Sequence, residues 1–279
     1  MVLLPGGFVR LLWPAVLVLV TSCGVTEGGI MPLVTGTFGT RPVVSVPRGA
    51  PGRMPRMAVL GVGSGRRTMP GDVVLADVEI RTWADNSPQL STYDANQPVT
   101  VVFDGRHVQE TWRQALIGQP AGSRVLLVGA AAQVLGPGME LGEVGAAEPL
   151  VVVLDILGGY PPDARLVGRP LPVVPADLTP MSPPRTLIDG SGAEVRAGAK
   201  VIVQYVAAAW PSRAAVDSSY RRGGPSAFRL VPGAVPPGWV TGLQGRRVGA
   251  RVTVGSPTSG YPDAVGEPRL YVIDILDAI

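Results

Sequence analysis

Cysteine, lysine and histidine are almost absent from this chain of 279 residues, and each occurs once, at Cys23, Lys200 and His107. A single cysteine cannot form a disulfide within the chain, and the scarcity of thiols is typical of an exported protein. Charged residues make up 16% of the chain and aromatic residues 5%. Because no basic stripe with interleaved aromatic side chains is present, we expect no binding to nucleic acid.

The first 23 residues predict a targeting segment. Arg10 supplies a positive charge, the apolar run 11–20 is broken only by Pro14, and residues 20–23 read Val-Thr-Ser-Cys. An apolar run of this length is too short to cross a bilayer as a mature helix, which favours a signal peptide. Residues 20–23 resemble the lipobox of bacterial lipoproteins, so we expect a lipidated Cys23 that anchors the protein outside the cytoplasmic membrane. The alternative is an ordinary secretory signal with an incidental cysteine, and a secreted protein.

Two stretches rich in glycine and proline divide the remaining chain, which is long enough for two domains. Residues 24–56 show no periodicity and predict a flexible tether. Residues 159–182 carry so many prolines that central strands and helix interiors are excluded, which predicts a semi-rigid linker. The expected domains are therefore 57–158 and 183–279.

An internal repeat relates the two expected domains. Residues recur at a constant spacing of 127, as in Trp112 and Trp239, without a gap over most of each unit. Such a register predicts two copies of one fold. The spacing falls to 119 in the last strand, where Asp155 matches Asp274, so the second unit has the shorter late loop. The other matched positions are Gly63/Gly190, Ser64/Ser191, Gly65/Gly192, Gly71/Gly198, Trp83/Trp210, Tyr93/Tyr220, Val108/Val235, Leu116/Leu243, Gly118/Gly245, Gly122/Gly249, Arg124/Arg251 and Val125/Val252.

Strand signals dominate each unit. Runs of β-branched residues that follow Gly-containing turns predict strands, and one short helix is expected per unit, over about 108–117 and 238–243. An antiparallel sheet packed over one short helix is an α+β domain. The strands are expected at 73–81, 99–103, 124–128 and 150–157, and at 200–207, 227–231, 250–254 and 270–276.

The second unit resembles the FKBP-type peptidyl-prolyl isomerases through motifs ordered along the whole domain. Residues 201–205, Val-Ile-Val-Gln-Tyr, are similar to the family's core strand and its pocket tyrosine, and residues 216–219, Val-Asp-Ser-Ser, to its Phe-Asp-Ser-Ser segment. Residues 235–239, Val-Pro-Pro-Gly-Trp, resemble its Val-Ile-x-Gly-Trp. The resemblance implies two tandem FKBP-like domains, each an antiparallel sheet wrapped around one short helix. Further similar positions are Gly190, Ser191, Gly192, Gly198, Pro225, Phe228, Leu230, Gly242, Leu243, Tyr261 and Tyr271.

The chemistry of prolyl isomerisation explains these residue types. Rotation about a peptide bond faces a barrier of about 18–20 kcal/mol, and an isolated X–Pro bond interconverts in roughly tens to hundreds of seconds. The twisted amide loses resonance and charge separation, so a dry, apolar pocket favours it over the planar form. Catalysis is then differential binding of the twisted amide. We expect neither a metal nor a cofactor.

The resemblance also implies roles for individual residues. Trp239 is expected to form the pocket floor, on which the proline ring packs, and Asp217 to act electrostatically near the amide carbonyl, held by Arg222 or Tyr205. Tyr261 is expected to donate its hydroxyl to a substrate carbonyl. Tyr205, Asp217, Trp239 and Tyr261 are the expected catalytic residues, and the expected substrate-binding residues are Val216, Arg222, Phe228, Val235, Pro236 and Tyr271.

The residues alone leave simpler interpretations open. Trp239 can be an ordinary core side chain, Asp217 the cap of a turn, and Arg222 a solvated loop charge. His107 is expected to lie on the surface at the start of the first unit's helix, without a function.

Several departures from the family pattern predict a weaker site. Val216 and Ser226 stand where the family has aromatic side chains, which predicts a wider and less apolar pocket. Pro236 stands where a backbone N–H of the family binds a ligand carbonyl, and proline has no N–H. One lost hydrogen bond costs about 0.5–1.5 kcal/mol, or about threefold to tenfold in affinity. We therefore expect reduced isomerase activity and weak macrolide binding.

The first unit has lost the polar residues of this pattern. At the spacing of 127, Val78 replaces Tyr205 and Leu90 replaces Asp217. Val134 likewise stands in place of Tyr261, so of the expected catalytic residues only the tryptophan, Trp112, remains. We expect this unit to be catalytically silent and to act as a spacer, a peptide-docking surface or a dimerisation unit.

Three functions remain open at this point. The first is a prolyl isomerase that acts on exported, proline-containing polypeptides and is confined to the second unit. The second is a chaperone-like envelope lipoprotein that holds peptides or a partner protein without turnover. The third is a structural envelope lipoprotein that reuses the fold. The set of Tyr205, Asp217 and Trp239 favours the isomerase, whereas Pro236 and the missing aromatics favour the binding module.

Overall fold

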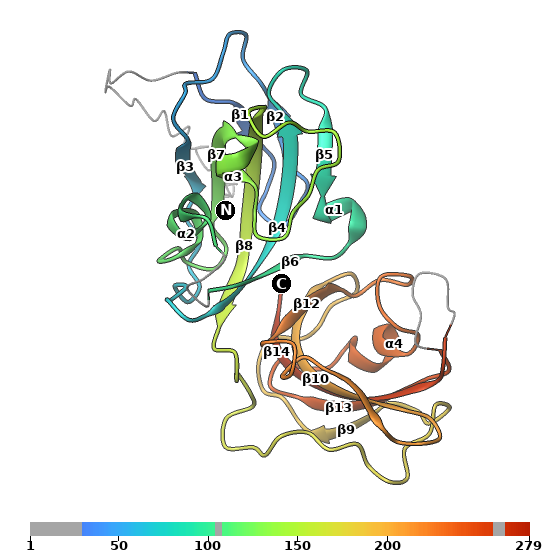
Figure 1. The fold of residues 1–279 in the computed structure, drawn as a ribbon. Coiled ribbons are helices and arrows are strands. Elements are labelled where there is room, and N and C mark those ends of the chain that lie inside the picture. The colour runs from blue at the N-terminus through green and yellow to red at the C-terminus, as the bar shows by residue number, and fades with distance from the viewer. Residues whose placement is uncertain (1–29, 104–107, 259–265) are drawn as a thin grey trace, which may run out of the picture.

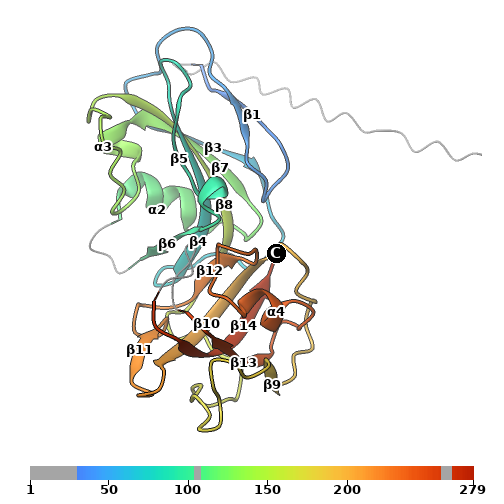
Figure 2. The same ribbon diagram turned by 90° about the vertical axis from the view of Figure 1, so that its right-hand side faces the viewer.

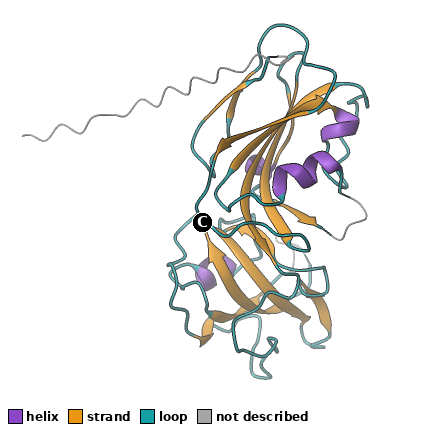
Figure 3. Cartoon of the chain, turned by 90° about the vertical axis from the view of Figure 1, so that its left-hand side faces the viewer, coloured by secondary structure: helices purple, strands orange, loops and turns teal. Residues whose placement is uncertain are grey.

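The computed structural model describes residues 30–103, 108–258 and 266–279. They form two domains stacked end to end, each built on a six-stranded sheet (Figure 1). Every strand pairing in these ranges is antiparallel, and the helices that carry Trp112 and Trp239 each pack against one face of their sheet (Figure 3). The expected α+β architecture is confirmed. None of the helices in the described ranges is long and apolar enough to cross a bilayer.

The two sheets have the same strand order. The first runs β3-β7-β8-β4-β5, with β6 also pairing with β4, and the second runs β9-β13-β14-β10-β11, with β12 also pairing with β10. The first-domain elements are β3 (Arg56–Gly61), β4 (Val73–Thr82), β5 (Pro88–Ser91), α1 (Thr92–Ala95), β6 (Val99–Val102), α2 (Glu110–Leu116), β7 (Arg124–Ala130), α3 (Ala131–Val134) and β8 (Pro149–Tyr160). The second-domain elements are β9 (Arg185–Ile188), β10 (Lys200–Ala209), β11 (Ala215–Ser218), β12 (Ser226–Arg229), α4 (Trp239–Leu243), β13 (Arg251–Ser256) and β14 (Arg269–Ala278).

The internal repeat extends to the irregularities of the sheets. A register shift falls between Leu75 and Ala76 where β4 pairs with β8, and another falls between Ile202 and Val203 where β10 pairs with β14. These two positions are 127 residues apart. A bulge bends a strand and strengthens its local twist, so both sheets curve at the same point.

One face of each sheet forms the main core, with α2 and α3 in the first domain and α4 in the second. In β10 the alternate residues Val201, Val203 and Tyr205 point into this core, where they join Trp239 and Leu243 of α4. This alternation is the consequence of the two-residue period of a strand.

The outer face of the first sheet is covered by the chain that precedes it. β1 (Leu33–Thr35) and β2 (Val43–Ser45) form a two-stranded ribbon, and Val44 packs with Trp83 over β7 and β8. Figure 2 shows β1 and α2 on opposite sides of this sheet. Residues 30–55, here called the N-terminal strap, are thus packed, which differs from the flexible tether expected from their composition.

A buried ion pair holds the N-terminal strap in place. Arg124 of β7 pairs with Asp155 of β8, with 2.6 Å between Nε and Oδ1. The same guanidinium donates to the carbonyl oxygens of Gly36, Thr37 and Thr40 at 2.8–3.0 Å. The backbone carbonyl groups of the strap are thus hydrogen-bonded by Arg124, which lies far along the sequence. The local sequence of the strap could not predict this contact.

The Pro-rich linker covers the outer face of the second sheet in the same way. Arg251 pairs with Asp274 at 2.6 Å and donates to the carbonyl oxygen of Pro170 at 2.8 Å. Leu178 is fully buried, and a Cβ on Gly255 of β13 would lie 2.2 Å from the carbonyl oxygen of Thr179. Only glycine therefore permits this close approach of linker and strand.

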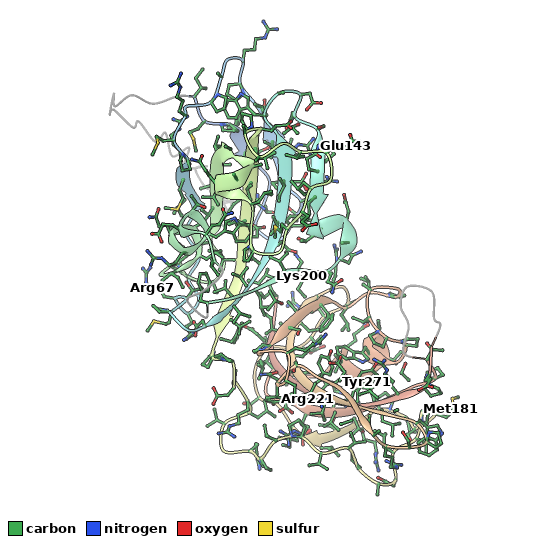
Figure 4. The ribbon with its side chains drawn as sticks, viewed as in Figure 1. Arg67, Glu143, Met181, Lys200, Arg221 and Tyr271 are labelled. Carbon is green, nitrogen blue, oxygen red and sulfur yellow. The ribbon has the colours of Figure 1, made fainter. Side chains whose placement is uncertain are left out.

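The two domains share a buried interface. Lys200, at the start of β10, forms an ion pair with Asp77 of β4 and lies 5.1 Å above the ring centre of Tyr93. Its ammonium group also donates to the carbonyl oxygen of Gly39 in the N-terminal strap, at 3.0 Å. Figure 4 places Lys200 between the domains. An apolar cluster surrounds this contact, with members Val73, Leu75, Leu157, Ile202, Ala227, Phe38, Tyr160 and Leu276.

Candidate functional site

Trp239 is positioned by the tight turn that begins α4. The backbone N–H of Trp239 donates to the carbonyl oxygen of Pro236 at 3.1 Å. Gly238 has a φ of +91°, and a Cβ there would lie 2.7 Å from the carbonyl oxygen of Gly255. Glycine is therefore required on both counts. The Pro-Pro-Gly turn directs the indole into the space between α4 and the sheet.

Three aromatic rings from three strands surround this indole. The centres of the Tyr205, Phe228 and Tyr271 rings lie 5.3–5.5 Å from that of Trp239, and all three pairs pack edge to face. Edge-to-face packing at this separation is favourable for aromatic rings. Val235 is buried in the same cluster. The structure thus brings together five of the expected site residues, and the Trp239 side chain is 1% exposed.

A polar group borders the aromatic cluster on the side of β11. The Tyr205 hydroxyl donates to Oδ2 of Asp217 at 2.7 Å, and Arg222 approaches the other carboxylate oxygen with its Nε at 3.4 Å. Arg222 also donates to the Tyr205 hydroxyl and lies 5.3 Å above that ring. Burial, reinforced by the hydrogen bond to Asp217, raises the pKa of Tyr205 above its ordinary value. The phenol therefore remains a hydrogen-bond donor at neutral pH.

Two buried residues that the sequence did not single out hold this polar group in position. The backbone N–H of Tyr205 donates to the Ser219 hydroxyl at 2.8 Å, and that hydroxyl donates to the Gln204 side chain. Thr92 and Asp77 make the equivalent contacts in the first domain. The spacing of 127 that relates Ser219 to Thr92, and Gln204 to Asp77, was the signal in the sequence that could have revealed these two residues.

The remaining expected residues lie elsewhere or outside the described ranges. Val216 on β11 is 43% exposed and is not a member of the aromatic cluster. Pro236 is buried beside the cluster. Cys23, His107 and Tyr261 fall outside the described residues. Within those residues, no group of three or more His, Cys, Asp or Glu side chains could hold a metal ion.

The equivalent tryptophan of the first domain is closed over by its own loop. The Trp112 indole N–H donates to the carbonyl oxygen of Val134 at 2.7 Å, and Gly136 packs so closely that a Cβ would lie 2.7 Å from the ring. The indole N–H of Trp239 is buried and has no hydrogen-bond partner in the part of the chain that the structure describes. In the first domain the late loop thus supplies the acceptor for its own indole.

Comparisons with known proteins identify the family. The family model of FKBP-type peptidyl-prolyl cis-trans isomerases matches residues 192–268. An FK506-binding protein of Streptomyces anulatus is 34% identical over 111 residues, which cover 37% of this chain and 86% of that protein. This chain belongs to the FKBP family. A probable FK506-binding protein of Corynebacterium glutamicum is 34% identical over 99 residues, covering 33% of this chain and 82% of that protein.

Solved structures match this FKBP with lower similarity. FkpA from Escherichia coli is 22% identical, with a TM-score of 0.29, over 34% of this chain and 46% of that chain. The three FKBP domains of wheat FKBP73 are 15% identical, with a TM-score of 0.31, over 81% of this chain and 94% of that chain. The matched family region lies in the second domain, which is therefore an FKBP-type peptidyl-prolyl isomerase domain.

Replacing Pro236 by isoleucine is expected to strengthen the binding of a proline-containing peptide to this FKBP about threefold to tenfold. The substitution restores a backbone N–H beside the aromatic cluster, and one net hydrogen bond contributes about 0.5–1.5 kcal/mol. Titration of an Ala-Leu-Pro-Phe peptide measures the change. Pro237→Ile is the matched control and should leave affinity unchanged. Equal or weaker binding by Pro236→Ile would show that the register assumed for this turn is wrong.

Proposed function

We propose that this FKBP is a peptidyl-prolyl cis-trans isomerase of exported proteins, with reduced activity that is confined to the second domain. The observation that carries the proposal is the linked group of Tyr205, Asp217 and Arg222 at the border of the aromatic cluster around Trp239. Among the described residues, the second domain alone places a carboxylate next to the buried tryptophan in this way, because Val78 and Leu90 stand at the first-domain positions equivalent to Tyr205 and Asp217.

The geometry supports catalysis through binding of the twisted amide. The proline ring packs against the Trp239 indole, and the surrounding rings exclude water. Asp217 lies at the border, where its charge acts on the amide carbonyl as resonance is lost. Since the indole is 1% exposed, a proline ring reaches it only when neighbouring side chains give way. This requirement and the missing N–H at Pro236 are the physical reasons for reduced activity and weak macrolide binding.

The first 23 residues support a site of action outside the cytoplasmic membrane. We infer that residues 1–23 are a lipoprotein signal peptide and that Cys23 is lipidated, which places the protein outside the cytoplasmic membrane. The basic residue, the apolar run and the four residues ending at Cys23 support this inference. Metabolic labelling with a radioactive fatty acid is expected to label the wild-type chain and not Cys23→Ser, and equal labelling would contradict it.

The two equivalent tryptophans test where the activity lies. We expect Trp239→Phe to lower kcat/KM about tenfold, because the smaller ring loses part of the platform, equal to about 1.4 kcal/mol of transition-state stabilisation. Trp112→Phe makes the same change in an equally buried side chain and should leave kcat/KM within about twofold. A protease-coupled assay with an Ala-Leu-Pro-Phe peptide measures both. A larger loss of kcat/KM in Trp112→Phe would place the activity in the first domain and contradict the proposal.

Binding without turnover is the second candidate function. The enclosed indole and the missing N–H at Pro236 favour it. Both features hinder the access of a proline ring to Trp239 and its isomerisation, but they hinder contact between a polypeptide and the protein surface less. Assisted refolding of a denatured protein that is unaffected by Asp217→Val or Trp239→Ala would support this candidate over the isomerase.

A further inference from the structure

Gln204 is a polar side chain on the outer face of the second sheet, and it is fully buried. Its neighbours Val203 and Tyr205 point into the main core, so Gln204 points to the opposite face. Buried polar groups have hydrogen-bond partners. Here Nε2 donates to the carbonyl oxygen of Pro162 at 3.1 Å, and Oε1 accepts from the Ser219 hydroxyl. Because Pro162 follows the last strand of the first domain by two residues, Gln204 joins the start of the Pro-rich linker to the second domain.

The Pro162 carbonyl fixes the direction of the hydrogen bonds that follow it. A carbonyl oxygen can only accept, so the donating nitrogen of the Gln204 amide faces the linker and the accepting oxygen faces Ser219. The Ser219 hydroxyl then uses its one hydrogen on Gln204 and accepts from the backbone N–H of Tyr205, at 2.8 Å. The contact with Pro162 thus sets the orientation of the Gln204 amide.

Ser219 sets the register of the two strands that carry the candidate site. Its backbone N–H donates to the carbonyl oxygen of Tyr205 at 3.1 Å, and its hydroxyl accepts from the N–H of the same residue. Asp217 precedes Ser219 by two residues on β11, so these two hydrogen bonds bring its carboxylate to the Tyr205 hydroxyl on β10. A slip of one residue in this register would turn Asp217 to the other face of the sheet.

The loop after β11 has a second contact with the start of the linker. This loop, residues 219–225, carries Arg222. A Cβ on Gly224 would lie 3.1 Å from Cα of Pro162 and 2.7 Å from Cγ2 of Val73 on β4. Glycine therefore permits the linker and the first domain to approach the loop this closely. The position of Arg222 depends on this packing as well as on β11.

The first domain uses the equivalent strand position for a contact of its own. Asp77 stands 127 residues before Gln204 and pairs with Lys200 of the second domain. In both units this position therefore contacts another part of the chain. Leu90 stands where the second unit has Asp217, so only in the second unit does this position lead to the carboxylate of the candidate site.

We propose that Gln204 is a positioning residue of the isomerase site, through which the linker at Pro162 holds Asp217 in place. The proposal rests on the proposed function and gives the linker a part in catalysis. Gln204 acts through Ser219 and not on the substrate. The proline ring packs on Trp239 in the planar and the twisted amide alike, whereas the Asp217 charge acts on the twisted form. Loss of Gln204 should therefore lower kcat and leave KM unchanged.

The variants Gln204→Leu and Thr253→Val test the residue in the chain 24–279. Thr253 is also a fully buried polar side chain of the second sheet, and it donates to the carbonyl oxygen of Arg185 at 3.4 Å. With an Ala-Leu-Pro-Phe peptide we expect Gln204→Leu to lower kcat about fivefold, with KM within about twofold, as expected for lost hydrogen bonds. Thr253→Val should keep the wild-type kcat and KM. Urea unfolding shows that both variants are folded.

An insertion tests the linker itself. A Gly-Ser dipeptide between Pro161 and Pro162 moves the Pro162 carbonyl away from Gln204 and should lower kcat as Gln204→Leu does. The two changes combined should lower kcat no further than either alone, because they break the same contact. The same dipeptide after Val167, which is 97% exposed, is the matched control and should leave kcat unchanged.

The hydrogen exchange of the Gln204 side-chain amide, followed by NMR, reports on the contact without any assay of activity. Exchange should be slow in the wild-type chain and after the control insertion, and fast after the insertion before Pro162. Fast exchange in the wild-type chain would show that the linker does not contact Gln204 and would overturn the proposal.

The kinetic results can overturn the proposal in three further ways. An unchanged kcat in Gln204→Leu, or an equal loss in Thr253→Val, would show that Gln204 does not position the site. A loss in Gln204→Leu with full kcat after the insertion before Pro162 would assign the effect to Ser219 without the linker. A wild-type chain without turnover would contradict the proposed function itself, while slow exchange of the Gln204 amide would still show the contact with the linker.

Discussion

Lys200→Met is expected to lower the free energy of unfolding by about 3–5 kcal/mol, because it leaves the buried carboxylate of Asp77 without its partner. The Lys200 side chain is 8% exposed and that of Asp77 is 1% exposed, so water cannot replace the lost ion pair. The same ammonium group contacts the N-terminal strap, and its loss loosens the contact between the domains. Urea unfolding of the chain 24–279 measures the change as a lower transition midpoint.

Two control variants separate this effect from the loss of any ion pair. Arg185→Met breaks the exposed pair with Asp177 and should cost less than about 1 kcal/mol. The double variant Asp77→Leu/Lys200→Met replaces the buried pair by apolar side chains and should lie within about 1.5 kcal/mol of the wild type. An unchanged midpoint in Lys200→Met would show that Lys200 does not join the two domains.

The pH dependence of the Lys200→Met variant follows from Asp77. Burial raises the pKa of Asp77 above its ordinary value, although Lys200 opposes the shift. A raised pKa in the folded state means that folding favours the protonated carboxyl. The contribution of Asp77 to the free energy of unfolding is therefore present at low pH and is lost as the pH rises. Without Lys200, the main opposition to the effect of burial is gone, so the pKa of Asp77 rises further. The stability difference between the variant and the wild type should therefore narrow as the pH falls.

Asp217→Val is expected to lower kcat/KM on an Ala-Leu-Pro-Phe peptide about tenfold to a hundredfold, or about 1.4–2.7 kcal/mol of transition-state stabilisation. The variant removes the charge beside the amide and the acceptor for the Tyr205 hydroxyl. Asp217→Asn keeps an oxygen that accepts this hydrogen bond but loses the charge, and should have an intermediate kcat/KM. The difference between the two variants measures the electrostatic part.

Asp177→Val is the matched control for this prediction. It removes an exposed carboxylate that also pairs with an arginine, and neither residue belongs to the aromatic cluster. Its kcat/KM should equal that of the wild type. If Asp217→Val keeps full activity while Trp239→Phe loses it, the site works through its apolar surface alone and the assigned role of Asp217 is wrong.

The repeat made most of the fold predictable from the sequence. The expected strand at 73–81 is β4 (Val73–Thr82), and the expected helix at 108–117 is α2 (Glu110–Leu116). The short edge strands β3 and β9 escaped prediction, because glycine and proline surround them and each has few residues to show a period. The packing of the N-terminal strap escaped for another reason. It depends on Arg124, which stands far along the chain.

The candidate site was predictable because the motif residues of the family occur in this sequence in the same order. Tyr205, Phe228, Trp239 and Tyr271 come from separate elements, and the structure brings their rings together. The sequence could not show that the Trp239 side chain is enclosed, because enclosure depends on how three strands and α4 pack. Nor could it reveal the role of Lys200, since a lone lysine beside a β-branched run gives no sign of a partner in another domain.

The most direct test of the central claim is the rate of cis–trans exchange in a proline-containing peptide, measured by NMR exchange spectroscopy with a catalytic amount of the chain 24–279. Unaided, the peptide interconverts over roughly tens to hundreds of seconds. Our account predicts exchange cross-peaks between the cis and trans signals with the wild-type chain, and their loss with the double variant Asp217→Val/Trp239→Phe. A wild-type chain that leaves the exchange rate at its unaided value would contradict it.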